Sequence, residues 1–143
     1  MNSTTNDLLK SPLRRPGTGL KIVRIMIGLI LGVHAVHGLV NPAATNGFGG
    51  YLGSIGFPFG VALAWLIQIG QFCSCVGLIL SRLVVPSCIC HLVILTVGIG
   101  LVHFSSGWFV VGAGRNGMEY SITLMGCIVA ILWGYWPVKR STS

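Results

Sequence analysis

The sequence predicts an all-α membrane protein, a single domain built as a bundle of four transmembrane helices. Two observations carry this prediction. The composition is 53% hydrophobic and only 8% charged, with a mean hydropathy of +0.85, far from the balance of a soluble domain. The chain also contains four apolar runs long enough to cross a bilayer as helices, which takes about 20 residues each. We place these spans at 22–40, 58–80, 83–104 and 118–136.

The segment before the first span, residues 1–20, is polar and basic and is predicted to be a disordered cytoplasmic tail. The transmembrane domain then occupies residues 21–138. A basic stretch followed by an apolar run is also typical of a signal peptide. However, this run is too long for the hydrophobic part of such a peptide, and it contains His34 and His37. We therefore interpret it as an uncleaved first span.

The positive charges indicate how the spans are oriented. Eight of the nine Lys and Arg residues fall on one side of the predicted bundle, and Arg115 alone falls on the other. The positive-inside rule makes the basic side cytoplasmic, so both termini are predicted to be inside. The aromatic residues of 48–59, 108–109 and Tyr120 mark the outer boundary, and those of 133–136 mark the inner one. Because the charges follow the span ends and form no binding face, we expect the lipid bilayer and not nucleic acid as the partner.

The connecting segments differ in length and composition. Residues 41–57 are rich in glycine and predict an outer loop with at most a short interfacial turn. Arg82 lies in a very tight inner turn, so the second and third spans should form a helical hairpin. The outer segment 105–117 contains a G-x-G-x-x-G pattern between Gly112 and Gly117. A dinucleotide site needs an amphipathic helix after this pattern and an acid about 20 residues on. Here a membrane span follows and residues 135–143 contain no acid, so we interpret the pattern as coincidental.

Inside the first span, Gly28 and Gly32 form a small-xxx-small element that permits close helix packing. The favoured partner is another helix of the same bundle, and a second subunit is the alternative.

Polar side chains in all four spans predict one layer in the outer half of the bundle. Because such groups are costly to place against lipid, we expect them to converge on the bundle interior. A hydrogen-bonded polar cluster is the favoured interpretation, and a proton or quinone site is the alternative. No metal is assigned, because the residues lack a diagnostic ligand spacing. The candidate site residues are His34, His37, Gln68, His103, Glu119 and Tyr120.

Glu119 is one of only two acidic residues, the other being Asp7 in the tail. An ionisable group at the edge of a span is a functional candidate. The sequence also offers a structural explanation, because Asn116 and Glu119 have the spacing of a capping box, with Asn116 as the N-cap.

The five cysteines include two Cys-x-Cys pairs on either side of the predicted turn at Arg82. In an antiparallel hairpin, Cys73 would lie level with Cys90, and Cys75 with Cys88. Residues i and i+2 differ by about 200° around a helix, so both pairs cannot face each other at once. Packing is favoured over a disulfide, because buried cysteine usually behaves as a small apolar residue. His91, next to Cys90, is interpreted as a helix-packing residue in preference to a ligand.

Several short pieces in order resemble the DoxX family of small four-helix bacterial membrane proteins, over nearly the whole chain after residue 20. They are Arg24 with Gly28 and His37-Gly38, then Gly56-Phe-Pro58, Gly77-Leu-Ile-Leu-Ser-Arg82, His103, and Gly117-Met-Glu119-Tyr120. The family's second span often carries a glutamate where this chain has Gln68 or Gln71, and glutamine cannot ionise.

The resemblance implies a multi-pass protein of the bacterial inner membrane that serves as a subunit of a quinone- or thiol-linked redox system. The resemblance permits quinone as a cofactor. It also implies a redox protein or a second copy of the chain as the partner. The alternative function is a non-catalytic scaffold for another membrane protein, with Gly28–Gly32 and the loop 112–117 as contact surfaces.

Overall fold

The computed structural model describes residues 16–112 and 115–137, and every regular element in these ranges is helical. The first of these helices, α2, runs from Pro16 to Val40 and has 25 residues. It therefore begins before the predicted span, and residues 16–20 are helical where a disordered tail was expected. The remainder of the predicted tail, residues 1–15, lies outside the described ranges.

Three further helices match the remaining predicted spans closely. Helix α4 covers Gly60–Ile79 and α5 covers Val84–Gly98. α5 continues through a π-helical turn, η1 (Ile99–His103), and a 3-10 turn, η2 (Phe104–Ser106). Helix α6 covers Glu119–Tyr135. By length and composition, three helical stretches of the described chain can cross a membrane, and the 17-residue α6 is a shorter apolar helix.

The segment predicted as an outer loop is instead helical, because Pro42–Ser54 forms helix α3. Its glycines are poor helix formers, so packing must supply the stability. α3 packs on α4 at two close contacts: a side chain at Gly49 would meet the Val61 backbone at 2.5 Å, and one at Gly60 would meet the Gly53 nitrogen at 2.7 Å. Thr45 also donates from its hydroxyl to the Gly38 carbonyl at 2.8 Å, which holds α3 against the end of α2.

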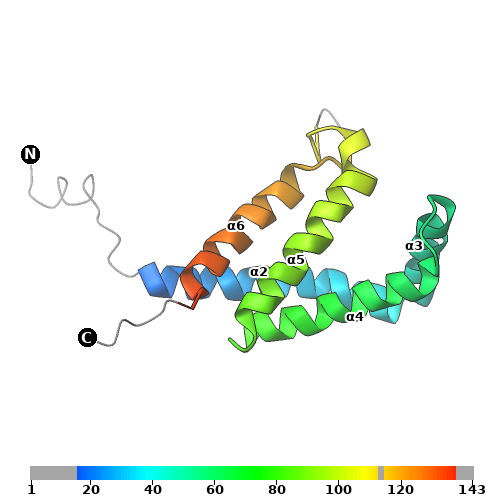
Figure 1. Cartoon of the computed structure of the whole chain (residues 1–143). Helices are drawn as coiled ribbons and strands as arrows, with labels where there is room; N and C mark the ends of the chain where they lie inside the picture. The colour runs from blue at the N-terminus through cyan, green and yellow to red at the C-terminus, as the bar shows by residue number, and fades with distance from the viewer. Residues whose placement is uncertain (1–15, 113–114, 138–143) are drawn as a thin grey trace, which may run out of the picture.

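The helices form two antiparallel pairs, α2 with α4 and α5 with α6, that meet at one end and diverge toward the other (Figure 1). We call the meeting point the converging end; it contains the start of α2, the end of α4, the start of α5 and the end of α6. Gly134 lies against the Leu20 side chain there. α3 lies at the opposite, diverging end of the α2–α4 pair.

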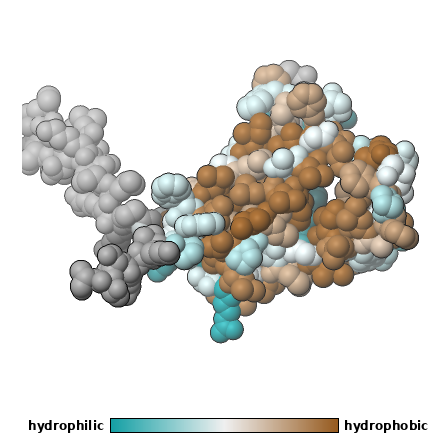
Figure 2. Space-filling view, in the orientation of Figure 1, coloured by the Kyte–Doolittle hydropathy of each residue, from teal (hydrophilic) through white to brown (hydrophobic). Residues whose placement is uncertain are grey.

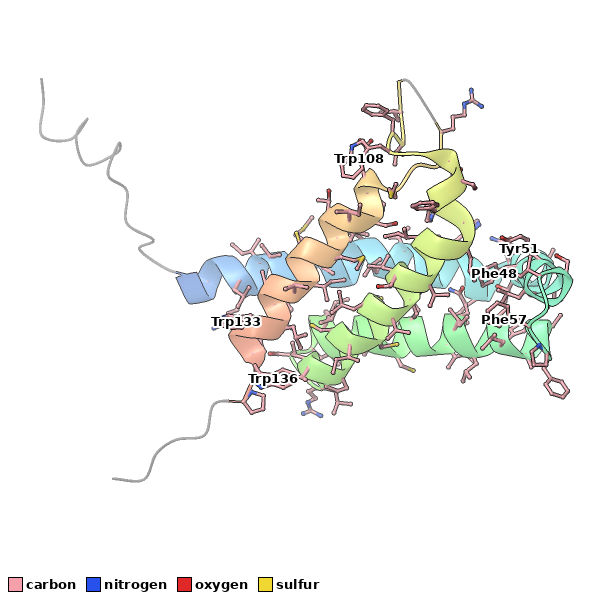
Figure 3. The ribbon with its side chains drawn as sticks, turned by 45° about the horizontal axis from the view of Figure 1, so that its top comes forward. Phe48, Tyr51, Phe57, Trp108, Trp133 and Trp136 are labelled. Atoms are coloured by element: carbon pink, nitrogen blue, oxygen red, sulfur yellow. The ribbon has the colours of Figure 1, made fainter. Side chains whose placement is uncertain are left out.

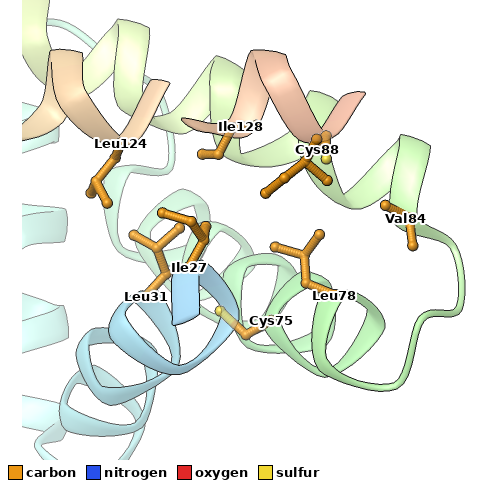
Figure 4. Packing of buried hydrophobic residues seen from close by; sticks show 9 residues of the cluster. Ile27, Leu31, Cys75, Leu78, Val84, Cys88, Leu124 and Ile128 are labelled. Atoms are coloured by element: carbon orange, nitrogen blue, oxygen red, sulfur yellow. The ribbon is translucent and has the colours of Figure 1, made fainter. Parts of the chain in front are cut away.

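A cluster of buried apolar residues fills the half of the bundle near the converging end, and it draws on all four long helices (Figure 4). The exterior is also largely apolar, and hydrophilic residues gather mainly at the margins of the face in Figure 2. Apolar surface both inside and outside is what a helix bundle in lipid requires. The buried members of the cluster are Ile27, Leu31, Cys75, Leu78, Val84, Cys88, Leu124, Ile128 and Ile131.

The small-xxx-small element of α2 faces α4. A side chain added at Gly28 would lie 2.8 Å from Ile79 Cγ1 and 3.3 Å from the Cys75 carbonyl oxygen, whereas one at Gly32 would make an ordinary 3.8 Å contact with Cys75 Cβ. The element therefore serves packing within the bundle, as favoured from the sequence, and Gly28 is not available as a contact surface for a partner protein.

Arg24 differs from its sequence interpretation, which counted it among charges beside the span. It is only 4% exposed, its Nη1 donates to the Ile79 carbonyl at 3.3 Å, and its guanidinium lies 5.7 Å from the centre of the Tyr135 ring. Both contacts are at C-terminal ends of helices, where the helix dipole favours a cation. Arg24 therefore ties α2 to α4 and α6 at the converging end.

Aromatic side chains mark both ends of the molecule (Figure 3). Trp133 and Trp136 lie at the converging end, whereas Phe48 and Tyr51 on α3, and Trp108 after η2, lie toward the diverging end. This distribution agrees with the two aromatic boundaries expected from the sequence.

A candidate functional site in the α4–α5 hairpin

The residues of the predicted outer layer are dispersed in the structure. His34 and His37 are both exposed on α2, and the His37 ring lies against Asn41, with Nδ1 and Nδ2 3.3 Å apart. Gln68 is half-buried on α4 and donates from Nε2 to the Ala35 carbonyl at 2.6 Å. It therefore ties α4 to α2 instead of reaching α5 or α6.

His103 and Glu119 both hold the segment that joins η2 to α6. Because a carbonyl oxygen only accepts, His103 Nδ1 must be the donor to the Asn116 carbonyl, at 2.8 Å. Glu119 Oε1 accepts from the Val110 N–H at 3.0 Å. Tyr120, next along α6, is 50% exposed. The hydrogen bonds of His103 and Glu119 thus run to backbone groups of the connecting segment.

The capping-box expectation for Asn116 and Glu119 is wrong. Helix α6 begins at Glu119 itself, with Met118 at the N-cap and no side-chain cap bond. Asn116 instead has a left-handed backbone with φ of 62°. Glu119 is the first residue of α6, and its carboxylate bonds the Val110 N–H of the connecting segment and not the N-cap.

The predicted single layer is not assembled, because the two helix pairs diverge at the depth where these residues lie. A hollow opens there between α5 and the arm formed by α2, α3 and α4 (Figure 2). The Tyr51 hydroxyl on α3 donates to the Leu101 carbonyl in η1 at 2.6 Å and so bridges the two arms. From the sequence Tyr51 is expected only at the aromatic boundary, and the π-helical turn that presents Leu101 has no simple sequence signal.

The structure brings together a different polar pair, Cys75 of α4 and His91 of α5. The Cys75 thiol sulfur lies 3.5 Å from His91 Nε2, and His91 Nδ1 lies 2.9 Å from the Ser87 carbonyl oxygen. Cys75 is 2% exposed and His91 is fully buried. From the sequence both residues are expected to be packing residues, and their separation of 16 positions gives no sign of contact.

The hydrogen bonds determine the proton positions in this pair. The Ser87 carbonyl can only accept, so His91 Nδ1 carries a proton. In the neutral ring Nε2 is then an acceptor, and the Cys75 S–H must donate to it. The imidazole is thus held with its basic nitrogen toward a thiol, which is the arrangement by which a base activates a nucleophile.

The α4–α5 turn fixes the relative position of the two residues. Helix α4 ends in a Schellman-type turn, in which the Arg82 N–H bonds the Gly77 carbonyl at 2.9 Å and Ser81 takes the left-handed position with φ of 59°. A side chain at Gly77 would meet the Ser87 hydroxyl oxygen at 2.5 Å. This close approach brings the first turns of α5 against α4, so that His91 reaches Cys75.

Other polar side chains lie along the same seam. Gln71 precedes Cys75 by about one turn of α4, on the same face, and is only 5% exposed. Among the described residues, the buried side-chain polar atom without a hydrogen-bond partner is Arg24 Nε and not an atom of the Gln71 amide. Ser74 and Ser87 are also buried. We call Gln71, Ser74, Cys75, Ser87 and His91 the polar seam.

All five cysteines are free thiols. Cys75 and Cys88 point to different neighbours: Figure 4 shows Cys75 beside α2 and Cys88 beside α6. Cys88 is fully buried like Cys75 but has no histidine partner in the described chain.

The seam offers a thiol and an imidazole in contact in a water-poor interior. Within the described residues, no group of three or more His, Cys, Asp or Glu side chains is placed to hold a metal ion. A search of family models, of curated proteins and of solved structures finds no match to this chain.

Proposed function

We propose that the chain is an integral membrane subunit of a thiol-linked redox system, in which the Cys75 thiol is the reactive group and His91 its base. The observation that carries the proposal is the 3.5 Å contact between the two side chains inside a highly apolar helix bundle. An ionisable residue at such depth is costly and is found mainly at functional sites. The order of short motifs that resembles the DoxX family adds to the redox assignment.

In the proposed topology the bundle crosses the bacterial inner membrane four times, with the converging end in the cytoplasm. The start of α2 and the end of α6 both lie at this end, which is consistent with an even number of crossings between them. α6 has 17 residues, at the lower limit of the range of about 17–25 that spans a bilayer. Of the Lys and Arg residues assigned to the cytoplasm that the structure describes, Lys21 and Arg82 lie at helix ends on that side, and Arg24 is buried just inside it.

Reporter fusions test this topology. A fluorescent protein that folds only in the cytoplasm should be bright when fused after the C-terminus or at Arg82. Alkaline phosphatase, which is active only outside, should work when inserted after Ser106. Active phosphatase at the C-terminus would mean that α6 does not cross the membrane and would contradict the four-span topology.

The structure gives reasons to prefer the thiol-linked form over the other two functions. The outer groups expected to bind quinone are apart: Gln68 bonds α2, and His103 and Glu119 bond the connecting segment. The scaffold function loses one of its contact surfaces, because Gly28 packs against α4.

The proposed function predicts that Cys75 is needed for resistance to thiol oxidants. A strain without the protein would receive the wild type, Cys75→Ser, His91→Phe or Cys73→Ser, followed by a membrane-permeant oxidant such as diamide. We expect the wild type and Cys73→Ser to restore growth, because Cys73 is exposed and outside the seam. Cys75→Ser and His91→Phe should not restore it. Full recovery with Cys75→Ser would contradict the proposal.

A further inference from the structure

The guanidinium of Arg24 is buried at the converging end with few partners. In the described chain, its Nε is the enclosed side-chain polar atom that has no hydrogen-bond partner. The side chain is 4% exposed, and it contacts the Ile79 carbonyl through Nη1 at 3.3 Å and the Tyr135 ring at 5.7 Å. A guanidinium carries a permanent positive charge and five N–H donors. One neutral carbonyl and one ring leave most of that charge uncompensated.

The described chain offers Arg24 no acidic partner. Its one acidic side chain, Glu119, begins α6, whereas Arg24 lies beside Tyr135 at the other end of that helix. The whole sequence has nine Lys and Arg residues and only two acids, so most of the positive charges need counterions from outside the chain. A buried charge without a counterion is costly, and an anion bound nearby would lower that cost.

Two exposed basic residues lie outward from Arg24. Helices α2 and α4 are antiparallel, and they meet where Arg24 bonds the Ile79 carbonyl. Three residues back along α2 is Lys21, on the same face of the helix as Arg24. Three residues on from Ile79 is Arg82, in the turn that follows α4. Both side chains are exposed, so an anion at the converging end can contact them directly.

We infer that Lys21, Arg24 and Arg82 form a binding site for the phosphate of an anionic phospholipid. Lys21 and Arg82 contact the phosphate, and the buried Arg24 adds its charge from beneath. A bond to Nε is not required, because the guanidinium charge is delocalised and acts through protein of low dielectric constant. Basic pockets between transmembrane helices are known to bind lipid head groups. The inference is independent of the proposed thiol chemistry.

The surroundings of these three residues favour a lipid over a soluble anion. Trp133 and Trp136 are exposed at the converging end, as aromatic residues at a membrane–water boundary are (Figure 3). Large apolar side chains next to the basic residues are also exposed, namely Ile22 and Ile25 on α2 and Leu80 after α4. A phospholipid can match both features, with its phosphate on the basic residues and its acyl chains on the apolar ones. A soluble phosphate can match only the first.

Thermal unfolding of the purified full chain in mild detergent tests the inference. The delipidated protein would receive phosphatidylglycerol, phosphatidylcholine or inorganic phosphate, and native mass spectrometry would count the bound lipids. We expect phosphatidylglycerol to raise the midpoint of unfolding by about 5 °C at about ten times its Kd. Phosphatidylcholine and inorganic phosphate should change the midpoint much less, because one carries a cationic head group and the other has no acyl chains.

Substitutions assign the roles of the three basic residues. Lys21→Gln and Arg82→Gln should each weaken phosphatidylglycerol binding by about fivefold, the usual contribution of one basic residue near an anionic surface. Arg24→Met should weaken it by about tenfold or more, because its charge acts through protein and not through water. Arg115→Gln is the matched control, since Arg115 is exposed in the outer segment, and it should bind like the wild type. Lys21 and Arg82 are exposed, so their variants decide the question even if Arg24→Met does not fold.

Three results would overturn the inference. Equal binding of phosphatidylglycerol by the wild type and all the variants would mean that these residues do not form the site. Equal stabilisation by inorganic phosphate would assign the basic residues to a soluble anion. Stability that is independent of lipid, and that falls in Asp7→Asn only while Arg24 is present, would make Asp7 of the chain itself the counterion.

Discussion

The two glycines of α2 provide a sharp test of the bundle, because they share a helix face yet differ in the space beside them. Alanine at Gly28 would place its methyl carbon 2.8 Å from Ile79 Cγ1 and 3.3 Å from the Cys75 carbonyl oxygen. The Ile79 side chain can move, but the backbone oxygen cannot, so α2 and α4 must shift apart. Such overpacking typically costs about 1–3 kcal/mol, against a helix-propensity gain of about 1 kcal/mol from replacing glycine.

Alanine at Gly32 would make only a 3.8 Å contact with Cys75 Cβ, so the propensity gain should remain. Gly28→Ala is thus expected to lower the free energy of unfolding by up to about 2 kcal/mol, and Gly32→Ala to raise it by up to about 1 kcal/mol. Reversible unfolding in mild detergent measures both, and native mass spectrometry records the oligomeric state. Equal stability of the two variants, with a loss of oligomer in both, would refute packing of this face within the bundle.

Three further substitutions test the segment before α6 and the bridge between the arms. Asn116→Gly should leave the free energy of unfolding unchanged or raise it, and Asn116→Ala should lower it by about 1 kcal/mol, because the left-handed backbone at this position favours glycine. Equal losses of stability in both variants, measured by thermal unfolding, would support a side-chain cap by Asn116 instead. Glu119→Gln should keep the bond to the Val110 N–H, whereas Glu119→Ala should speed hydrogen exchange at that amide; unchanged exchange in the alanine variant would count against the bond. Tyr51→Phe should cost about 1 kcal/mol and raise exchange in η1, since the Leu101 carbonyl loses its donor; exchange identical to the wild type would exclude the bridge.

The sequence predicted the long helices well, because long apolar runs are the strongest signal a membrane chain carries. It failed at α3, where glycines that disfavour a helix in isolation allow it to pack closely on α4. It also placed the start of the first helix too late, because hydropathy does not report helix that extends beyond the apolar run. These misses arise where tertiary contacts override local preference.

The candidate site was harder to predict for a geometrical reason. Depth along a span can be read from residue number, and His37, Gln68 and His103 were placed at a similar depth on that basis. Depth does not give the rotation of each helix or the angle between helix pairs, and here the pairs diverge. The Cys75–His91 contact, in contrast, forms where two helices stay close, because a tight turn joins α4 to α5.

The S–H stretching band of Cys75 tests the central claim most directly, because a donated hydrogen bond lowers its frequency. Infrared difference spectra of the wild type against Cys75→Ser and against Cys88→Ser isolate the bands of the two buried thiols. We expect the Cys75 band at the lower frequency, and we expect it to move up to that of Cys88 in His91→Phe. Coincident bands in the wild type, unchanged by His91→Phe, would show that the thiol does not donate to His91 and would contradict the account.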